Sequence, residues 1–413
     1  MKVIRLHPVP EAEHDCPHCH QPLKVTGWYM PGMRNLADLS CSVCSREFYG
    51  DLAAGQALYT PMILEKKTGT VHDKHHVEWF AQWLRDSYSK RTDSRVAFTV
   101  EVRRPITRPV VLLNCLDTLY GHSLLKLLNS EYHLATEVDL IVIVPSFLAW
   151  MVPEGVGQVW IVDLPLKRGR EWNDWLAREI QRRVESFETV SLSQALSHPH
   201  PADFHIENFT GVKPFPLEQW EQRLERPTVT FIWRDDRTWQ VPKDNSVSAN
   251  LKRLARPSGP AGGQRKLVID LAQELRRDWP TLDFAIAGLS DQGDDDLGAW
   301  IEDLRFPAMN DDLERRCCER YAASHIVVGV HGSNMLLPSA HAGGVVELIG
   351  TERWGNFLQD ILIHDAADSR DALFRYRFLP DSSQPDAVAQ LVTFILKNQP
   401  AFRLLMNVRD LKR

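Results

Sequence analysis

The feature that most restricts the fold of this chain is an alternation of apolar runs with amphipathic helical segments. In the first half, the runs RPVVLLNCLD, VDLIVIVP and GQVWIVDLP alternate with the helical patterns GHSLLKLLNSEY and EWNDWLAREIQRRVESF. Continuous apolar strands with helices between them predict a parallel sheet covered on both faces. We therefore expect an α/β, doubly wound, Rossmann-like domain over residues 95–220.

The same alternation returns in the second half of the chain. Strand patterns TVTFIWRDD, LDFAIAGL, HIVVGVHG and GVVELIG alternate with the helical patterns GQRKLVIDLAQELRRDW and NDDLERRCCERYAAS. A second doubly wound, Rossmann-like domain is expected over residues 227–385, followed by a helical segment over 386–413. The Gly- and Pro-rich stretch at 237–263 predicts a long mobile loop that closes over a ligand.

Composition excludes several classes of protein. The chain has 413 residues, too many for one ordinary core, and its 44% hydrophobic and 25% charged residues are typical of soluble globular proteins. A net charge of -6 argues against a general nucleic-acid binder, which would normally carry a basic face. The N-terminus lacks the apolar region of a signal peptide, and no run is long enough for a membrane span. We therefore expect a cytoplasmic protein.

Two cysteine pairs near the N-terminus predict a metal site. Cys16 and Cys19 form one CxxC motif, and Cys41 and Cys44 form another. Two such pairs can place four thiolates on one tetrahedral Zn²⁺ ion, which would staple a ribbon too small to fold alone. We expect a zinc ribbon over residues 1–60 with a structural zinc and a possible protein partner. The alternatives are two redox motifs or unpaired thiols.

Several histidines also suggest metal ligands. His18 lies inside the first cysteine pair and is a competing ligand, but four thiolates already fill the site. His72, His75 and His76 precede a helical pattern, and we interpret them as solvated residues at the start of a helix.

Polar side chains follow several predicted strands, where open parallel sheets bind their ligands. Asp117 and His122 follow the first strand of the first half. In the second half, the segment His331-Gly332-Ser333-Asn334 follows a buried strand. A glycine lets the backbone approach a ligand closely, and the free N–H groups of such a turn suit phosphate oxygens. An ordinary helix cap with a buried histidine is the alternative.

Two further residues favour a phosphate ligand. Arg234 follows another apolar strand and offers a planar fork of donors for a diphosphate, unless it pairs with Asp235 or Asp236. Glu347 lies after the same turn and could accept the hydroxyls of a ribose, unless it is a buried partner of an arginine such as Arg353. Neither GxGxxG nor a Walker motif occurs. Together these residues predict a nucleoside diphosphate site.

The segment VVGVHGSNMLLPSAHAGGVVELI resembles the C-terminal signature of glycosyltransferase family 61 (DUF563-like), and TFIWRDDRTW is similar to the strand that begins the donor domain of those enzymes. The resemblance covers about the C-terminal 120 residues of the chain and Arg234. It implies a GT-B fold, a nucleotide-sugar donor on the C-terminal domain, a glycan acceptor on the N-terminal domain, and chemistry that needs no metal.

This resemblance makes a glycosyltransferase the leading hypothesis. An inverting transfer needs a base for the acceptor hydroxyl and positive charge for the departing diphosphate. His122 is the first candidate for the base and Asp117 the second, with packing at a helix start as the alternative role of His122. The competing hypotheses are an interaction or regulatory protein, in which the zinc ribbon contacts a partner and the GT-B-like body has lost its chemistry, and a nucleotide-sugar epimerase or hydrolase.

Overall fold

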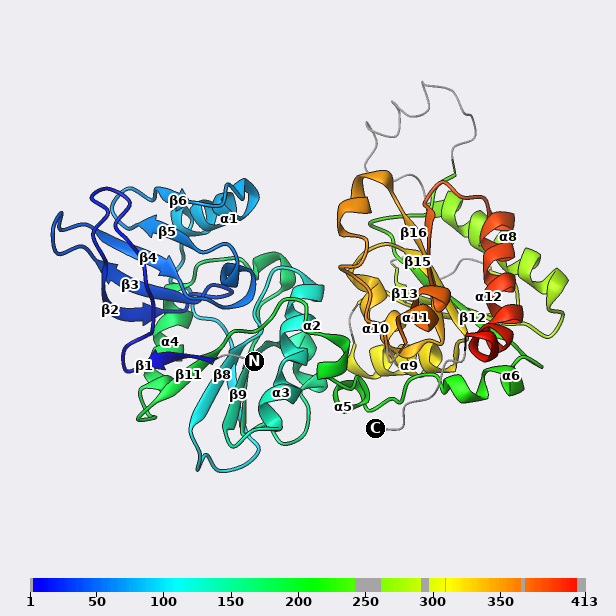
Figure 1. The fold of residues 1–413 in the computed structure, drawn as a ribbon, viewed down its shortest axis with the longest axis horizontal. Coiled ribbons are helices and arrows are strands. Elements are labelled where there is room, and N and C mark those ends of the chain that lie inside the picture. The colour runs from blue at the N-terminus through cyan, green and yellow to red at the C-terminus, as the bar shows by residue number, and fades with distance from the viewer. Residues whose placement is uncertain (1–2, 242–260, 291–296, 309, 365–367, 407–413) are drawn as a thin grey trace, which may run out of the picture. The chain divides into compact units, whose positions relative to one another are not determined.

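The computed structural model of this chain describes residues 3–241, 261–290, 297–308, 310–364 and 368–406 (Figure 1). It divides into two compact units, Met1–His205 and Ile206–Arg413. Each unit contains a sheet of mainly or wholly parallel strands with helices, and the first unit also contains an antiparallel sheet with four clustered cysteines. The expectation of an α/β protein with parallel sheets and a cysteine cluster is confirmed.

The antiparallel sheet of the first unit, here called the ribbon sheet, has five strands that pair in chain order. Helix α1 (Glu78–Ser89) follows it and buries Phe80, Ala81 and Leu84. The sheet continues past residue 60, where we expected the zinc ribbon to end. Its strands are β2 (Lys24–Tyr29), β3 (Leu36–Ser40), β4 (Glu47–Asp51), β5 (Met62–Glu65) and β6 (Val71–Asp73).

The larger sheet of the first unit has the strand order β1-β11-β8-β9-β10-β7. Its four inner strands run parallel, and an antiparallel strand closes each edge. Every residue of the two central strands is buried, as the continuous apolar runs predict. The elements are β1 (Val3–His7), β7 (Phe98–Val102), β8 (Val110–Asn114), α2 (Tyr120–Leu128), α3 (Ser130–Leu134), β9 (Asp139–Pro145), β10 (Gln158–Val162), α4 (Asp174–Val184) and β11 (Val190–Ser193).

The two sheets of the first unit share one hydrophobic core. Cys16, Trp28 and Phe48 of the ribbon belong to the same buried cluster as Leu112 and Trp160 of the larger sheet. Apolar burial stabilises by about 25 cal/mol per Å² removed from water, so these contacts couple the ribbon to the sheet. The ribbon and the larger sheet therefore stabilise each other.

The sheet of the second unit is wholly parallel, with the strand order β14-β13-β12-β15-β16-β17. The chain starts in the centre, moves to one edge, and returns to the centre before moving to the other edge. This reversal creates a topological switch point between β12 and β15. The strands are β12 (Thr228–Trp233), β13 (Asp283–Leu289), β14 (Ile301–Phe306), β15 (Ile326–Val330), β16 (Gly344–Ile349) and β17 (Tyr376–Pro380).

Helices surround the second sheet. Helices α8 and α12 lie side by side, as do α9 and α10 (Figure 1). The side chain of Asn310 caps α9 by accepting hydrogen bonds from the N–H groups of Asp312 and Leu313. The helices are α5 (Glu207–Thr210), α6 (Trp220–Arg223), α8 (Ala261–Asp278), α9 (Asp311–Ala323), α10 (Leu336–His341), α11 (Ser369–Arg375) and α12 (Pro385–Leu405). None of the described helices has both the length and the apolar composition needed to cross a lipid bilayer.

In the two larger sheets, five strands lie where we expected none: β1, β7, β11, β14 and β17. All but β11 lie at sheet edges. An edge strand is partly exposed, so it does not need a continuous apolar run. In β14, for example, Glu302 and Asp303 are exposed. Most of the loop predicted at 237–263 falls on 242–260, outside the described residues.

Candidate functional site

The four paired cysteines lie in two turns with the same backbone geometry. The residue after the second cysteine is left-handed in both turns, with φ of 57° at His20 and at Ser45. Its N–H donates to the carbonyl oxygen of the first cysteine, at 2.9 Å for Cys16 and 3.0 Å for Cys41. The matching turns bring the four sulfur atoms within 4.8 Å of one another.

The spacing of these sulfur atoms fits a tetrahedral zinc ion. Sγ of Cys16 lies 3.6 Å from Sγ of Cys44, and Sγ of Cys19 lies 3.5 Å from Sγ of Cys41. Zinc–sulfur bonds of 2.3 Å at tetrahedral angles place sulfur atoms about 3.8 Å apart. Burial raises the pKa of the Cys44 thiol. In contrast, the N–H of Cys44 donates to Sγ of Cys41 at 3.4 Å, and this bond is the largest of the causes that lower the pKa of the Cys41 thiol to about 6. The thiolate that results is the form that binds zinc.

The switch point of the second sheet carries two arginines that contact one turn. Arg234 follows β12, and His331 follows β15. Nη1 of Arg234 donates to the carbonyl oxygen of His331 at 3.3 Å and to Oδ1 of Asn334 at 2.7 Å. Nη1 of Arg237 donates to the same carbonyl oxygen at 2.5 Å. Arg234 also binds the carboxylate of Asp236 at 2.7 and 2.6 Å, which is the ion pair expected as its alternative role.

Gly332 is needed where Arg234 approaches this turn. Its φ of 149° is one that residues with a side chain rarely adopt. A Cβ at this position would lie 2.1 Å from Nη1 of Arg234 and 3.2 Å from Nη1 of Arg237. Ser333 begins the short 3₁₀ turn Ser333–Met335 that follows. The missing side chain therefore lets the guanidinium groups lie against the backbone.

His331 and Glu347 form a buried pair below the turn, with 1% and 0% of their surfaces exposed. Nδ1 of His331 lies 3.2 Å from Oε2 of Glu347, and Nε2 lies 3.4 Å from Oδ2 of Asp360, without hydrogen-bond geometry. Burial, reinforced by Asp360, raises the pKa of Glu347 well above its ordinary value. Burial lowers the pKa of His331. Glu347 therefore faces a histidine and not the solvent.

Positive charge is crowded around this pair. The guanidinium groups of Arg237, Arg353 and Arg234 all act on His331 and lower its pKa further. Burial, together with repulsion from Arg234 and Arg353, also lowers the pKa of Arg237. A bound anion relieves repulsion of this kind. The amide Nδ2 of Asn334 is buried without a hydrogen-bond partner and adds an unused donor. These groups can bind phosphate oxygens.

Replacing Glu347 with glutamine is expected to remove a loss of stability that the wild-type second unit undergoes as the pH rises above the ordinary pKa of glutamate. An unfolded glutamate ionises near pH 4.3, whereas burial keeps the folded Glu347 protonated to higher pH. Between these two pKa values the folded state binds the extra proton, so wild-type stability falls as pH rises, by up to about 1.4 kcal/mol per unit. Glutamine cannot ionise, so it removes this loss.

Urea unfolding of the second unit at pH 5 and pH 8 measures the effect. Glu221, which is exposed on the same unit, provides the control substitution Glu221→Gln. Parallel pH profiles for wild type and Glu347→Gln would contradict the raised pKa of Glu347.

In the first unit, Asp117 and His122 lie together with a lysine. Nζ of Lys126 donates to Oδ2 of Asp117 at 2.8 Å, and Nδ1 of His122 lies 3.4 Å from Oδ1. The N–H groups of Thr118 and Leu119 donate to the same Oδ1 at 2.8 and 3.2 Å. Burial opposes ionisation of Asp117, but Lys126 and His122 outweigh it, so the pKa of Asp117 lies well below its ordinary value. A carboxylate held in this way is a weak base.

A second buried ion pair lies beside this cluster. Nη1 of Arg34 donates to Oδ2 of Asp51 at 2.8 Å. The Arg34–Asp51 pair and the Asp117–Lys126 pair both line one cavity of about 20 Å³. This volume is enough for about one water molecule. The cluster is thus closed off on this side, and the side chain of His122 is 10% exposed.

Two residues that act in these clusters, Lys126 and Asp360, were not predicted. The sequence does contain a signal for Lys126, because this charged residue interrupts the apolar run LLKLL one helical turn after His122. The sequence contains no such signal for Asp360, because only the fold brings it close to His331. Arg237 was noted with Arg234 among the polar residues that follow the strand pattern FIWRDDRTW. The structure brings Arg234 to the turn at His331–Asn334 and Asp117 to His122.

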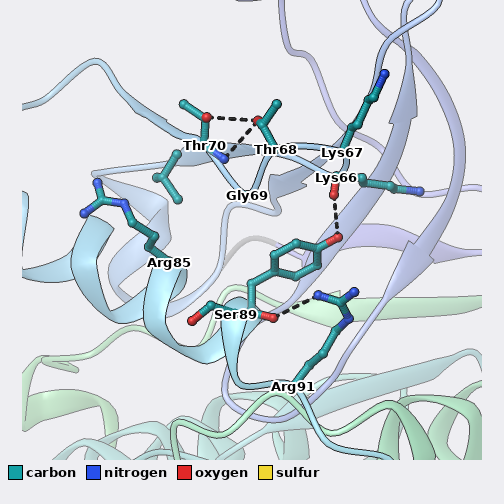
Figure 2. Close-up of a pocket in the computed structure, with 10 residues that line it drawn as sticks. Lys66, Lys67, Thr68, Gly69, Thr70, Arg85, Ser89 and Arg91 are labelled. Carbon is teal, nitrogen blue, oxygen red and sulfur yellow. Dashed lines mark hydrogen bonds between the residues drawn. The ribbon is translucent and has the colours of Figure 1, made fainter.

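A cavity of about 420 Å³ lies elsewhere, between the β5–β6 turn and the C-terminal part of α1. Figure 2 shows Lys67, Arg85 and Arg91 around it, with the hydroxyl of Thr68 in its wall. None of the predicted site residues lines it. This cavity is therefore separate from the candidate phosphate site.

Comparison with known proteins leaves the family of this chain open. No family model matches the sequence, and no curated protein matches it. Among solved structures, E. coli ADP-heptose LPS heptosyltransferase II is similar to it, with 13% sequence identity and a TM-score of 0.37. The match covers 71% of this chain and 100% of that one. A similarity of this strength carries no argument about function, which therefore rests on the site.

Proposed function

We propose that this protein is a glycosyltransferase that moves a sugar from a nucleotide-diphosphate sugar to a glycan or polysaccharide acceptor. The observation that carries the proposal is the meeting of Arg234 and Arg237 at the turn beginning with His331. This turn lies at the switch point between β12 and β15, where doubly wound sheets bind nucleotides. The guanidinium forks supply planar donors for two phosphates.

In this proposal the transfer is inverting. A base removes the proton of the acceptor hydroxyl, whose oxygen attacks the anomeric carbon of the donor as the bond to the β-phosphate breaks. Arg234 and Arg237 stabilise the charge on the departing diphosphate. Gly332 permits their close approach, and the amide of Asn334 donates to a phosphate oxygen. Glu347 stays within the site as the buried partner of His331.

His122 is the proposed base, and Asp117 orients its imidazole ring. A carboxylate beside Nδ1 leaves the other ring nitrogen to accept a proton, as in other base–carboxylate pairs. Lys126 holds Asp117 ionised. The two units would form a GT-B pair, with the acceptor on the first unit and the donor on the second. The four cysteines hold a structural zinc, and the reaction itself uses no metal.

A panel of UDP, GDP, ADP and the matching nucleosides tests the proposal by calorimetry. Binding of one diphosphate, much tighter than its nucleoside, is expected. Incubation of the corresponding nucleotide sugar with a glycan acceptor should then release the diphosphate. Release that does not depend on an acceptor would favour a hydrolase, and epimerised donor would favour an epimerase. No binding by any member would favour the interaction protein. His122→Ala is expected to lower turnover by about 10²- to 10⁴-fold with binding retained.

A further inference from the structure

His18, Glu65 and His72 come from three separate segments of the ribbon and meet on one of its faces. His18 belongs to the first cysteine turn, Glu65 ends β5, and His72 lies in β6. Because His72 pairs with Ile63, and Glu65 lies two residues beyond Ile63, their side chains share one face of the sheet. We expected His72 to be solvated at a helix start, but it lies in a strand and is half-buried.

The ligand atoms of these three residues lie close together. All three lie within 4.8 Å of one another. Nε2 of His18 lies 3.4 Å from Oε2 of Glu65. Zinc bonds of about 2.0–2.1 Å at tetrahedral angles place nitrogen and oxygen ligands about 3.4 Å apart. The separation of His18 and Glu65 therefore matches that of two ligands on one zinc ion. A small movement of His72 would bring its ring nitrogen to the position of a third ligand.

The surroundings of the three residues also favour a cation. Glu65 is 3% exposed, and Nε2 of His72 is buried without a hydrogen-bond partner. A buried, unsatisfied nitrogen costs free energy that a metal bond would recover. Thr68, whose hydroxyl Figure 2 shows in the wall of the neighbouring cavity, donates to Oε2 of Glu65 at 2.9 Å. Such a partner orients a carboxylate ligand.

One cation already contacts this carboxylate. Nη1 of Arg46 lies 2.5 Å from Oε1 of Glu65. This contact uses Oε1 of Glu65, whereas the oxygen near His18 is Oε2, which accepts the hydrogen bond from Thr68 and keeps a second lone pair for a metal. The side chain of Arg46 is 44% exposed, so it can turn into solvent when a metal binds. The positive charge of Arg46 repels a metal ion, so we expect this site to bind a metal more weakly than the four-cysteine site does.

We propose that His18, Glu65 and His72 form a second metal site, which takes Zn²⁺ or a similar divalent transition metal. Two histidines and a glutamate are a ligand set that zinc uses with a fourth, open position. The side chain of His18 is 34% exposed, so this position is open to water or to a ligand. The chain then binds two metal ions, one held by four thiolates and one by nitrogen and oxygen.

Metal content after saturation with zinc and gel filtration tests this site. Wild type is expected to retain two zinc ions per chain, and His72→Ala and His18→Asn one each. The zinc ion that remains at the four cysteines shows that the variant is folded. If one of the two variants retains no zinc, it has unfolded, and the test then rests on the second variant. His75→Ala, a change at an exposed neighbour, should retain two. One ion in saturated wild type, or two in both folded variants, would overturn the proposal.

Cobalt provides an independent measurement. Cobalt at the four-cysteine site absorbs strongly through sulfur-to-metal charge transfer, whereas cobalt at the histidine–glutamate site lacks that band. Titration of wild type should show a thiolate band that saturates after one equivalent, followed by a weaker visible absorption. His72→Ala should remove only the second phase. If the second phase survives in both His72→Ala and His18→Asn, it comes from other ligands and the proposal fails.

Discussion

Replacing Cys16 with serine is expected to abolish binding of the zinc ion that we propose at the four cysteines and to unfold the first unit. Serine is not among the usual ligands of zinc, and a three-cysteine remnant binds the ion far more weakly. A structural zinc contributes about 10–16 kcal/mol to the folding of small zinc domains, as much as the whole stability of an ordinary domain. Cys16 also lies in the core that the ribbon shares with the larger sheet.

Calorimetry of the full chain measures this effect, because the chain has two compact units. The transition of the first unit should disappear or fall steeply, and the transition of the second unit should remain. The control is Cys317→Ser in the second unit, where a hydroxyl can still donate to the carbonyl oxygen of Leu304. If the first unit melts unchanged in Cys16→Ser, the four cysteines do not hold a structural metal.

Replacing Arg234 with alanine is expected to weaken binding of the preferred nucleoside diphosphate by about 10- to 150-fold. Hydrogen bonds to charged groups contribute about 1.5–3 kcal/mol, and each 1.4 kcal/mol is a factor of ten. Arg234 also holds the side chain of Asn334, so its removal loosens a second donor. Its partner Asp236 is 73% exposed, so the loss of the ion pair costs little stability.

Affinities for the diphosphate and for its nucleoside distinguish this role from a structural one. Arg234→Ala should weaken the diphosphate strongly and the nucleoside hardly at all. Arg234→Lys should retain part of the affinity, since it keeps the charge but loses the fork. Arg226, at the opposite end of β12 and 74% exposed, provides the control Arg226→Ala. Equal losses for both ligands would remove Arg234 from the phosphate site.

Patterns within short segments predicted the elements whose environment is uniform. The central strands β8, β9, β12, β13, β15 and β16 were all expected, because a strand buried on both faces must be apolar throughout. The cysteine pairs were equally clear, since a two-residue spacing brings both thiols to one turn. Edge strands such as β14 were missed, because they meet water and carry charged residues.

The sequence by itself determined that Arg234 and the turn at His331 each follow an apolar strand. Only the tertiary structure decided that these two strands are neighbours, because β13 and β14 lie between them in the chain and the strand order reverses at this point. The same holds for Glu347 beside His331 and for His72 with His18 and Glu65. Pairings between distant segments depend on how strands order themselves in a sheet, and no local spacing encodes that order.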